Sequence, residues 1–524
     1  MTIHRPFTER IKRALTAGAI LALASTGLSG CTIIQHVQGP QPNVPTTPAS
    51  GDVDEALRPY YEQQLDWQNC GQNRECATAK APMNWDDPSN GKEVELALVR
   101  IPAKGEKQGS LFTNPGGPGA SGFDFVEGAG TAVFSKDLQE SFDIVGWDPR
   151  GVGQSSAVEC VDDKGMDEFF YGVPNPMPKN DAEWIKHEQE KAKKFADACK
   201  QNTGELLEFV DTMSTVRDLD MLRSAVGDEK LFYFGFSYGT DIGAHYVDTF
   251  PDKVGRVVLD GATDPSLTQF EVVLGQQEGF ANATRAYLED CLKKGSKCPF
   301  TGNVDQAIKQ INDAMKKADQ TMPANKDGRK LTSTVMSTAI SFTMYSKMNW
   351  DALSEAFTAY LSQGDPAMFF ELSDAYYGRD KDGKYDSNMF EAFIAINCAD
   401  YPVERDPAKI REYNKKLREA TPIGEPGPEE LGDVQCEQWP FESKATPAPV
   451  KGEGAPPVLV VGTTGDPATP HRWAEAVSKQ LESGVLLSFK GEGHIAYGGQ
   501  STCVDSAVDE YLIKGTPPQD GTTC

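Results

Sequence analysis

No block of lysine or arginine residues occurs anywhere in this chain of 524 residues, and acidic side chains outnumber basic ones by 77 to 51. The formal net charge of −26 would repel nucleic acid phosphates and an anionic membrane surface. We therefore expect no nucleic acid partner, and we interpret the acidity as a charge that keeps the protein soluble. An acidic site for a cationic substrate is the alternative.

A long apolar run is also missing near the start, where residues 14–28 are too short to cross a bilayer comfortably. Four basic residues precede this run: Arg5, Arg10, Lys12 and Arg13. Such a segment is typical of an export signal, and the following Leu28-Ser-Gly-Cys31 resembles the bacterial lipobox. We predict a signal peptide over residues 1–30 and a lipid on Cys31 that anchors the protein to the extracytoplasmic face of the cell membrane. A plain secretory signal with an incidental cysteine is the alternative.

Cysteines in metal-binding spacing are absent, because no C-x-x-C pair occurs. Of the eleven cysteines, ten remain once Cys31 is set aside, an even number that suits an oxidising compartment. We expect structural disulfides, no metal and no cofactor. Pairing in sequence order is the simplest arrangement, although ten cysteines allow many others: Cys70–Cys76, Cys160–Cys199, Cys291–Cys298, Cys398–Cys436 and Cys503–Cys524.

The hydrophobic pattern divides the chain beyond Cys31 into four parts. Residues 31–53 are rich in proline and predict an extended tether. Apolar strands alternate with helices over residues 54–265 and again over 451–524, which indicates an α/β fold with a mostly parallel sheet covered on both faces. Residues 266–450 show helical patterns only and predict a large inserted lid.

The individual elements follow from this pattern. The predicted strands are residues 94–101, 109–114, 142–147, 231–235, 256–260, 457–462 and 484–489. The predicted lid helices are residues 268–293, 303–319, 333–343, 350–363, 365–377 and 406–420.

One pentapeptide carries a candidate nucleophile. Gly235-Phe-Ser-Tyr-Gly239 directly follows a predicted strand and precedes a predicted helix. G-x-S-x-G at such a junction forms the nucleophile elbow of α/β-hydrolases, in which a tight turn holds the serine hydroxyl above the sheet. We therefore predict that Ser237 is a catalytic nucleophile.

Histidine is scarce, with six in the chain, so the base that a serine nucleophile needs can be sought by elimination. Five are unsuited by position: His4 lies in the signal peptide, His36 in the tether and His187 in a charged helix, while His245 is eight residues beyond the serine on one helix and His471 begins another helix. His494 lies in a glycine-flanked loop after the last strong strand, and we predict that it is the base.

Two aspartates compete for the role of orienting that base. Asp466 follows the strand before His494, which produces the order Ser, Asp, His expected for this fold. Asp260 ends the preceding strand and is the rival. We favour Asp466.

The glycine-rich loop at residues 114–119 follows an early strand, where this fold places the oxyanion hole. Pro118 has no N–H to donate, so we predict that the backbone amides of Gly117, from this loop, and Tyr238, from the serine turn, bind the oxyanion.

Several motifs together resemble one family. They are Asn114-Pro-Gly-Gly-Pro-Gly, Asp148-Pro-Arg-Gly-Val-Gly-Gln-Ser155, Gly235-Phe-Ser-Tyr-Gly-Thr240, Gly465-Asp-Pro-Ala-Thr-Pro470, and Gly493-His-Ile-Ala-Tyr497 with Ser501-Thr-Cys503 and Gly521-Thr-Thr-Cys524. Over roughly residues 60–524 the chain is similar to the secreted tripeptidyl aminopeptidase-like branch of the α/β-hydrolases, which also contains prolyl iminopeptidases.

This resemblance implies a hydrolase that cleaves an amide or ester through an acyl-enzyme and releases short peptides from substrate N-termini. We expect the protein to be a monomer. An exopeptidase must recognise a free amino group, and the lid acids Asp400 and Glu437 are candidates for that contact. A carboxylesterase acting on acyl esters or envelope lipids with the same triad is the alternative. A lipid-anchored solute-binding protein would have no use for the three loops, and an inactive scaffold does not fit an intact triad.

Overall fold

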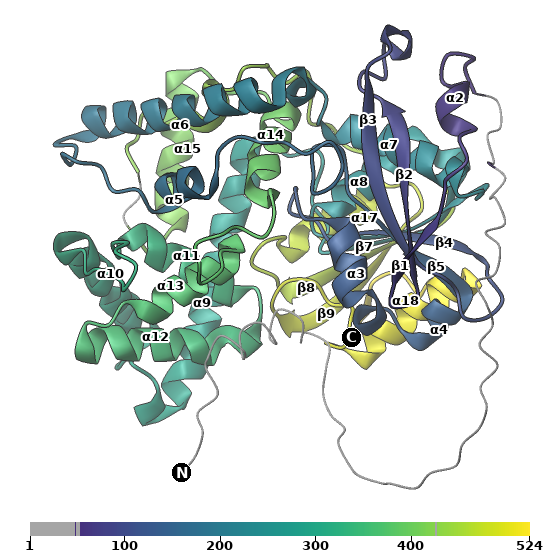
Figure 1. Ribbon diagram of the computed structural model, residues 1–524. Helices are drawn as coiled ribbons and strands as arrows, with labels where there is room; N and C mark the ends of the chain where they lie inside the picture. Colours follow the sequence, from purple (N-terminus) through teal and green to yellow (C-terminus); the bar gives the residue numbers. More distant parts are fainter. Residues whose placement is uncertain (1–47, 49–52, 425–426) are drawn as a thin grey trace, which may run out of the picture.

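A computed structural model describes residue 48, residues 53–424 and residues 427–524 (Figure 1). The predicted signal peptide, Cys31 and nearly all of the tether lie outside the described residues. No helix within the described part of the chain is both long and apolar enough to span a membrane. Nor does any group of His, Cys, Asp and Glu side chains in that part form a metal site.

The described strands form one sheet in the order β1-β2-β3-β5-β4-β6-β7-β8-β9-β10. The pairs from β1 to β5 along this order are antiparallel, and all later pairs are parallel. The strands are β1 (Gln68–Gly71), β2 (Arg74–Pro82), β3 (Glu93–Ile101), β4 (Gly109–Asn114), β5 (Phe142–Trp147), β6 (Leu231–Phe236), β7 (Val254–Asp260), β8 (Val458–Gly465), β9 (Gly484–Glu492) and β10 (Thr522–Thr523).

All of the predicted strands are therefore confirmed, and β1, β2 and β10 were not predicted. The parallel strands were found because both of their faces are buried, so their sequences are almost continuously apolar. β2 mixes charged and apolar residues because it belongs to the antiparallel edge of the sheet, and β10 has only two residues.

Two apolar cores cover the two faces of the sheet, since side chains alternate along each strand. Leu231 and Tyr233 of β6 point into one core, and Phe234 and Phe236 point into the other. The first face is covered by α7 (Thr212–Ala225), α8 (Gly239–Thr249) and α17 (His471–Gln480). The second face is covered by α3 (Gly122–Val133), α4 (Lys136–Ser141) and α18 (Thr502–Lys514). α2 (Arg58–Tyr61) packs beside α7.

The helical lid forms a separate lobe, which has its own apolar core beside the sheet (Figure 1). Its helices are α9 (Gln269–Lys293), α10 (Val304–Thr321), α11 (Ser333–Met344), α12 (Trp350–Gln363), α13 (Ala367–Tyr377), α14 (Met389–Asp400), α15 (Pro407–Ala420) and α16 (Val434–Glu437). The predicted lid helices are confirmed within a few residues, whereas α14 and α16 were missed.

The lid also receives a second segment that was assigned to the sheet domain. α5 (Asp163–Tyr171) and α6 (Asp181–Thr203) lie beside the lid helices in Figure 1. Asp167 of α5 pairs with Arg379 at 2.6 Å, and the Tyr171 hydroxyl donates to Asp374 at 2.8 Å. The prediction that all of residues 54–265 belong to the sheet domain therefore needs correction for α5 and α6, because a helical pattern does not say which neighbour its apolar face will contact.

Five disulfides join the cysteines of the described residues in sequence order, as predicted. Cys398–Cys436 links α14 to α16, and Cys503–Cys524 ties the C-terminus to the start of α18. The first of these bridges fixes the lid helix that ends at Asp400.

Candidate active site

Ser237 lies in the turn between β6 and α8, with a backbone φ of +54°. A positive φ is strained for a residue with a side chain. The turn is tight enough to exclude side chains on both sides: a Cβ added at Gly235 would collide with the Gly239 carbonyl, and one added at Gly239 would lie 2.5 Å from the Asn114 carbonyl oxygen. The Ser237 N–H donates to the Asp260 carbonyl oxygen at 2.9 Å and so fixes the turn to the end of β7.

His494 and Asp466 form a close pair. His494 Nδ1 lies 2.9 Å from each carboxylate oxygen of Asp466, whose side chain is fully buried. The carboxylate also accepts the backbone N–H groups of Ala468 and Thr469 at 2.9 Å and of Ile495 at 3.2 Å. Since a carboxylate can only accept, Nδ1 carries the proton and Nε2 is the basic atom.

The electrostatics of His494 suit a base. Burial lowers the pKa of His494, but the charge and hydrogen bond of Asp466, with a further contribution from the charge of Asp260, raise it above its ordinary value. His494 Nε2 is buried and has no hydrogen-bond partner within the described residues.

Thr469 is a member of this group that sequence reasoning missed. Its hydroxyl donates to Asp466 Oδ2 at 3.0 Å and lies 3.3 Å from His494 Nδ1. The sequence Asp466-Pro-Ala-Thr469 could have revealed this residue, because a threonine three residues after an aspartate can donate its hydroxyl to the aspartate carboxylate across a turn.

The rival acid, Asp260, is placed differently. Its buried carboxylate accepts the backbone N–H groups of Ala496 at 3.0–3.1 Å and of Tyr497 at 2.8 Å. The described hydrogen bonds include none between Asp260 and the His494 ring. The geometry therefore pairs the ring with Asp466, while Asp260 holds the loop that follows His494.

Ser237 and His494 both lie beside the end of β7. Asp260 O accepts the Ser237 N–H, and a Cβ added at the next residue, Gly261, would lie 3.3 Å from His494 Cε1. No hydrogen bond joins the serine hydroxyl to Nε2 among the described residues, which is common for such pairs before a substrate is bound.

The glycine-rich loop after β4 presses against the serine turn. A Cβ added at Gly116 would lie 2.8 Å from Ser237 Cβ and 3.0 Å from the Tyr238 nitrogen. The Gly116 N–H is already used, because it donates to the Asn114 side chain at 2.9 Å. Within the described residues the N–H groups of Gly117 and Tyr238 have no hydrogen-bond acceptor, so both are available to a substrate oxygen.

Two lid segments contact these loops. A Cβ added at Gly119 would lie 3.0 Å from the Phe393 nitrogen, so α14 begins directly over the glycine-rich loop. On the other side, the His494 N–H donates to the Tyr345 carbonyl oxygen at 2.9 Å, and the two rings make an edge contact at 5.4 Å. The lid therefore covers the site from two directions.

Asp400, one of the two predicted lid acids, approaches the site at the far end of α14. Its carboxylate accepts the Thr212 N–H at 2.7 Å and the Thr212 hydroxyl at 2.6 Å, and this hydroxyl lies 2.6 Å from the Tyr238 hydroxyl. Burial, followed by the charge of Asp211, raises the pKa of Asp400 well above its usual value. No Lys or Arg pairs with Asp400 in the described part of the chain.

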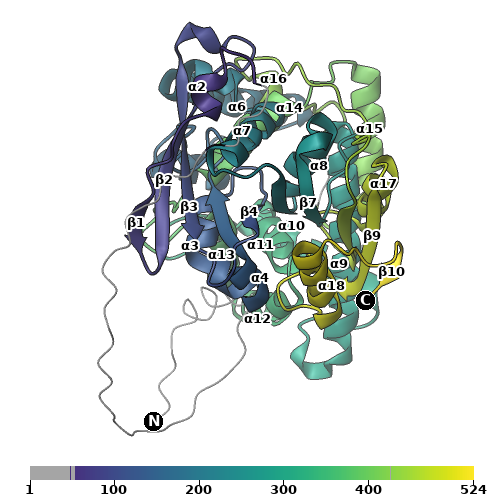
Figure 2. The ribbon, with the colours of Figure 1, turned by 90° about the vertical axis from the view of Figure 1, so that its right-hand side faces the viewer.

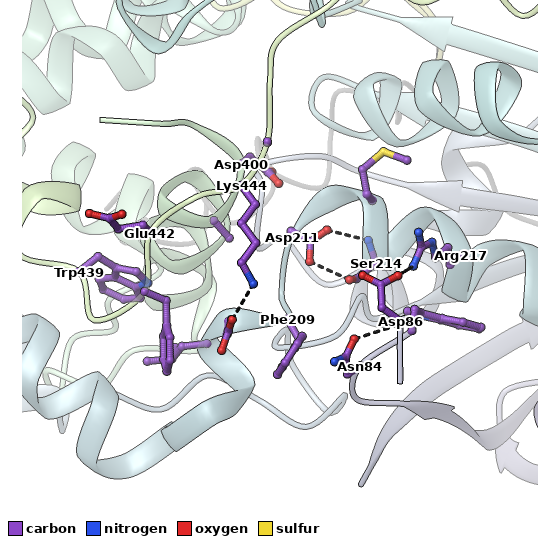
Figure 3. A pocket seen from close by; sticks show the side chains of 17 residues that line it. Asn84, Asp86, Phe209, Asp211, Ser214, Arg217, Asp400, Trp439, Glu442 and Lys444 are labelled. Carbon is purple, nitrogen blue, oxygen red and sulfur yellow. Dashed lines mark hydrogen bonds and ion pairs between the residues drawn. The ribbon is translucent and has the colours of Figure 1, made fainter. Parts of the chain in front are cut away.

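Asp400 also borders a cavity of about 320 Å³ between the sheet domain and the lid. Figure 3 shows Asp400, Asp211 and Lys444 around this space, with Trp439 and Phe209 also at its border. Lys444 is paired with Glu208 at 2.8 Å, so it does not neutralise Asp400.

Glu437, the second predicted lid acid, is not brought to the site. It lies on the short helix α16, where burial and the charge of Asp433 raise its pKa. None of its described contacts reaches Ser237, His494, the glycine-rich loop or Asp400. Glu437 follows Cys436, and the disulfide from Cys436 to Cys398 brings α16 close to α14. The Glu437 side chain nevertheless makes no described contact with the site.

A strained serine after a central strand, a histidine held by a buried carboxylate and two free amide donors define a serine hydrolase of the α/β-hydrolase fold. Figure 2, which views the molecule from the side, shows the sheet with helices on both faces.

Comparison with known proteins agrees with this class. Residues 429–524 match the family described as TAP-like protein. The chain is 33% identical to the serine protease Hip1 of Mycobacterium tuberculosis over 98% of both chains. It is also 33% identical to carboxylesterase B of the same organism over 96% of this chain and 95% of that one. A tripeptidyl aminopeptidase of Streptomyces lividans is 29% identical over 88% and 86%. The chain belongs to the TAP-like family of α/β-hydrolases.

Proposed function

We propose that Ser237 is the nucleophile, His494 the general base and Asp466 the acid that orients it. His494 Nε2 takes the Ser237 proton as the hydroxyl oxygen attacks the substrate carbonyl carbon. The N–H groups of Gly117 and Tyr238 donate to the oxyanion that forms. His494 then returns the proton to the leaving amine or alcohol, and an acyl-enzyme remains on Ser237. Water, deprotonated by His494, attacks the ester, and the acid is released as Ser237 regains its proton.

We propose further that the substrate is a peptide with a free N-terminus. The observation that carries this proposal is the half-buried Asp400 carboxylate, which is joined through Thr212 to Tyr238, the residue after the nucleophile. A carboxylate held close to another acid and without a cationic partner is a suitable acceptor for an ammonium group. The similarity to the tripeptidyl aminopeptidase supports the same conclusion.

The length of α14 favours a tripeptide as the released product. This helix contacts the glycine-rich loop near Phe393 and ends at Asp400. Seven residues of α-helix rise by about 10 Å, and three residues of extended peptide span about 10–11 Å. A substrate amine held at Asp400 would therefore place the third peptide carbonyl near the amides of Gly117 and Tyr238.

Replacing Asp400 by asparagine should raise KM for a tripeptide amide with a free N-terminus by about 10- to 100-fold, the value of one charge-assisted hydrogen bond. Since Asp400 must be ionised to pair with the ammonium, KM of the unmodified enzyme should fall as the pH rises through its elevated pKa. In Asp400→Asn this fall should disappear. Steady-state kinetics on the free tripeptide amide, its N-acetyl form and a short acyl ester measure these effects.

Glu437→Gln is the matched control, because it neutralises the lid acid that does not contact the site. It should leave KM for the free tripeptide amide unchanged. An Asp400→Asn enzyme that keeps its discrimination between free and N-acetylated peptides would contradict the role of Asp400.

A carboxylesterase is the second candidate, favoured by the similarity to carboxylesterase B. The same triad would hydrolyse an acyl ester, and Asp400 would then have no ammonium to bind. If the purified enzyme cleaves short acyl esters and leaves both peptide substrates intact, the esterase is correct and the aminopeptidase is rejected.

We also propose that the protein is exported and held at the extracytoplasmic face of the cell membrane, as a monomer, by a lipid on Cys31. The lipobox-like sequence before Cys31 and the disulfides support export. In Cys31→Ala the protein should move from the membrane fraction to the soluble extracytoplasmic fraction and lose incorporation of a labelled fatty acid. Retention of label and membrane association in this variant would disprove acylation at Cys31.

A further inference from the structure

Asp260 contacts both segments that carry the proposed reacting groups. Its backbone carbonyl accepts the Ser237 N–H at 2.9 Å. Its carboxylate, with no exposed surface, accepts the N–H groups of Ala496 and Tyr497 just beyond His494. The end of β7 therefore links the serine turn on one side to the histidine loop on the other.

Gly261, the residue after Asp260, lies close to the His494 ring. Gly261 has a φ of +73° and donates its N–H to the Val461 carbonyl oxygen at 3.1 Å. A Cβ added there would lie 3.3 Å from His494 Cε1 and 3.1 Å from the Thr469 hydroxyl. The backbone just after β7 thus lies against the imidazole, so a movement of this strand end would displace the ring.

Asp260 also acts on His494 through its charge. The groups around the imidazole are Asp466 on the loop after β8, Asp260 at the end of β7, and the Tyr345 ring and carbonyl from the lid. Burial raises the pKa of Asp260 to about 6, against the effect of its two amide hydrogen bonds; Asp466 raises it further and His494 lowers it. The negative charge of Asp260 in turn contributes to the raised pKa of His494.

The geometry points to Asp260 as a positioning residue that holds Ser237 and the His494 loop in register and whose charge stabilises protonated His494. This role rests on the proposed functions of Ser237, His494 and Asp466. Asp260 does not contact the reacting atoms and acts through the groups it holds.

Asp260→Asn separates charge from shape, because the amide oxygen can still accept the Ala496 and Tyr497 N–H groups. Without the charge, His494 loses its proton more easily. The acidic limb of the rate of Ser237 labelling by a fluorophosphonate probe should therefore shift to lower pH by roughly half a unit or more. The maximal labelling rate should stay within a few-fold of that of the unmodified protein, since the loop is still held.

Asp260→Ala removes the acceptor as well as the charge and leaves two buried N–H groups unsatisfied. The maximal labelling rate should fall by about 100-fold, as expected when reacting groups move apart by about 1 Å. Asp264→Asn is the matched control: Asp264 is a buried acid four residues further on that accepts from Ser266 and Gln480 and does not touch the histidine loop. Its labelling profile should remain unchanged.

A pH profile of Asp260→Asn that superimposes on that of the unmodified protein would overturn the inference, and this test stands even if Asp260→Ala does not fold. A shift of equal size in Asp264→Asn would overturn it too, because the effect would then be general. Failure of the proposed triad has a different signature, namely labelling that persists in Ser237→Ala.

Discussion

Replacing Ser237 by alanine is expected to abolish labelling by a fluorophosphonate probe and to lower kcat by about a millionfold, the loss found when the serine of such a triad is removed. The reason is that the proposed mechanism has no other atom to form the acyl-enzyme. The two amide donors at Gly117 and Tyr238 would remain and provide the residual rate.

The substitution should leave the fold intact. Alanine keeps the Cβ that already occupies the turn at a φ of +54°, so no new strain is added. The Ser237 hydroxyl makes none of the described hydrogen bonds, so none of those is lost. Circular dichroism and the melting temperature should match those of the unmodified protein. Ser501→Ala, which removes a hydroxyl that caps α18 and makes no described contact with Ser237, His494 or Asp466, should label normally. Labelling of Ser237→Ala at the normal rate would reject this serine.

The strands, and the residues of the proposed triad, could be found from sequence for a shared reason. A parallel strand is buried on both faces, so β6, β7 and β8 each appear as a short apolar run bounded by glycine or aspartate. The loops after such strands meet at one edge of the sheet. Once Ser237 was placed after one strand, a chain with six histidines left His494 as the suitable base.

The lid was predicted as a helical region, but its most relevant helix was missed. α14 has apolar residues on nearly all sides, because it packs against the sheet domain, α16 and the glycine-rich loop. A helix buried in this way has no polar face and therefore no 3.6-residue periodicity to detect. Asp400 was named from its acidic side chain, and its connection to Thr212 and Tyr238 required the structure.

The choice between Asp400 and Glu437 shows the same limit. Each acid lies within two residues of a cysteine of the same disulfide, so their positions in the sequence do not distinguish them. Only the direction of the side chains separates them, and this direction depends on how α14 and α16 pack. Likewise, the strand positions alone left Asp260 and Asp466 as alternatives, and hydrogen-bond partners distinguish the two carboxylates.

Asparagine at position 466 is expected to lower kcat by about 10⁴-fold, with KM nearly unchanged. The Asp466 carboxylate can only accept a hydrogen bond, so it keeps the proton of His494 on Nδ1 and leaves Nε2 free to take the Ser237 proton. The carboxamide of asparagine can turn its NH₂ group toward Nδ1, which favours the opposite tautomer with Nε2 protonated. It also removes the charge that stabilises the imidazolium formed during acyl transfer.

The informative experiment compares Asp466→Asn with Asp260→Asn under identical conditions. Single-turnover rates on a tripeptide amide should show the 10⁴-fold loss for Asp466→Asn and a loss of only a few-fold for Asp260→Asn at its pH optimum. The reverse order would make Asp260 the orienting acid and would require the histidine ring to turn away from Asp466. The existing contacts argue against that reversal, because Asp260 already accepts the amides of Ala496 and Tyr497, whereas both oxygens of Asp466 lie 2.9 Å from His494 Nδ1.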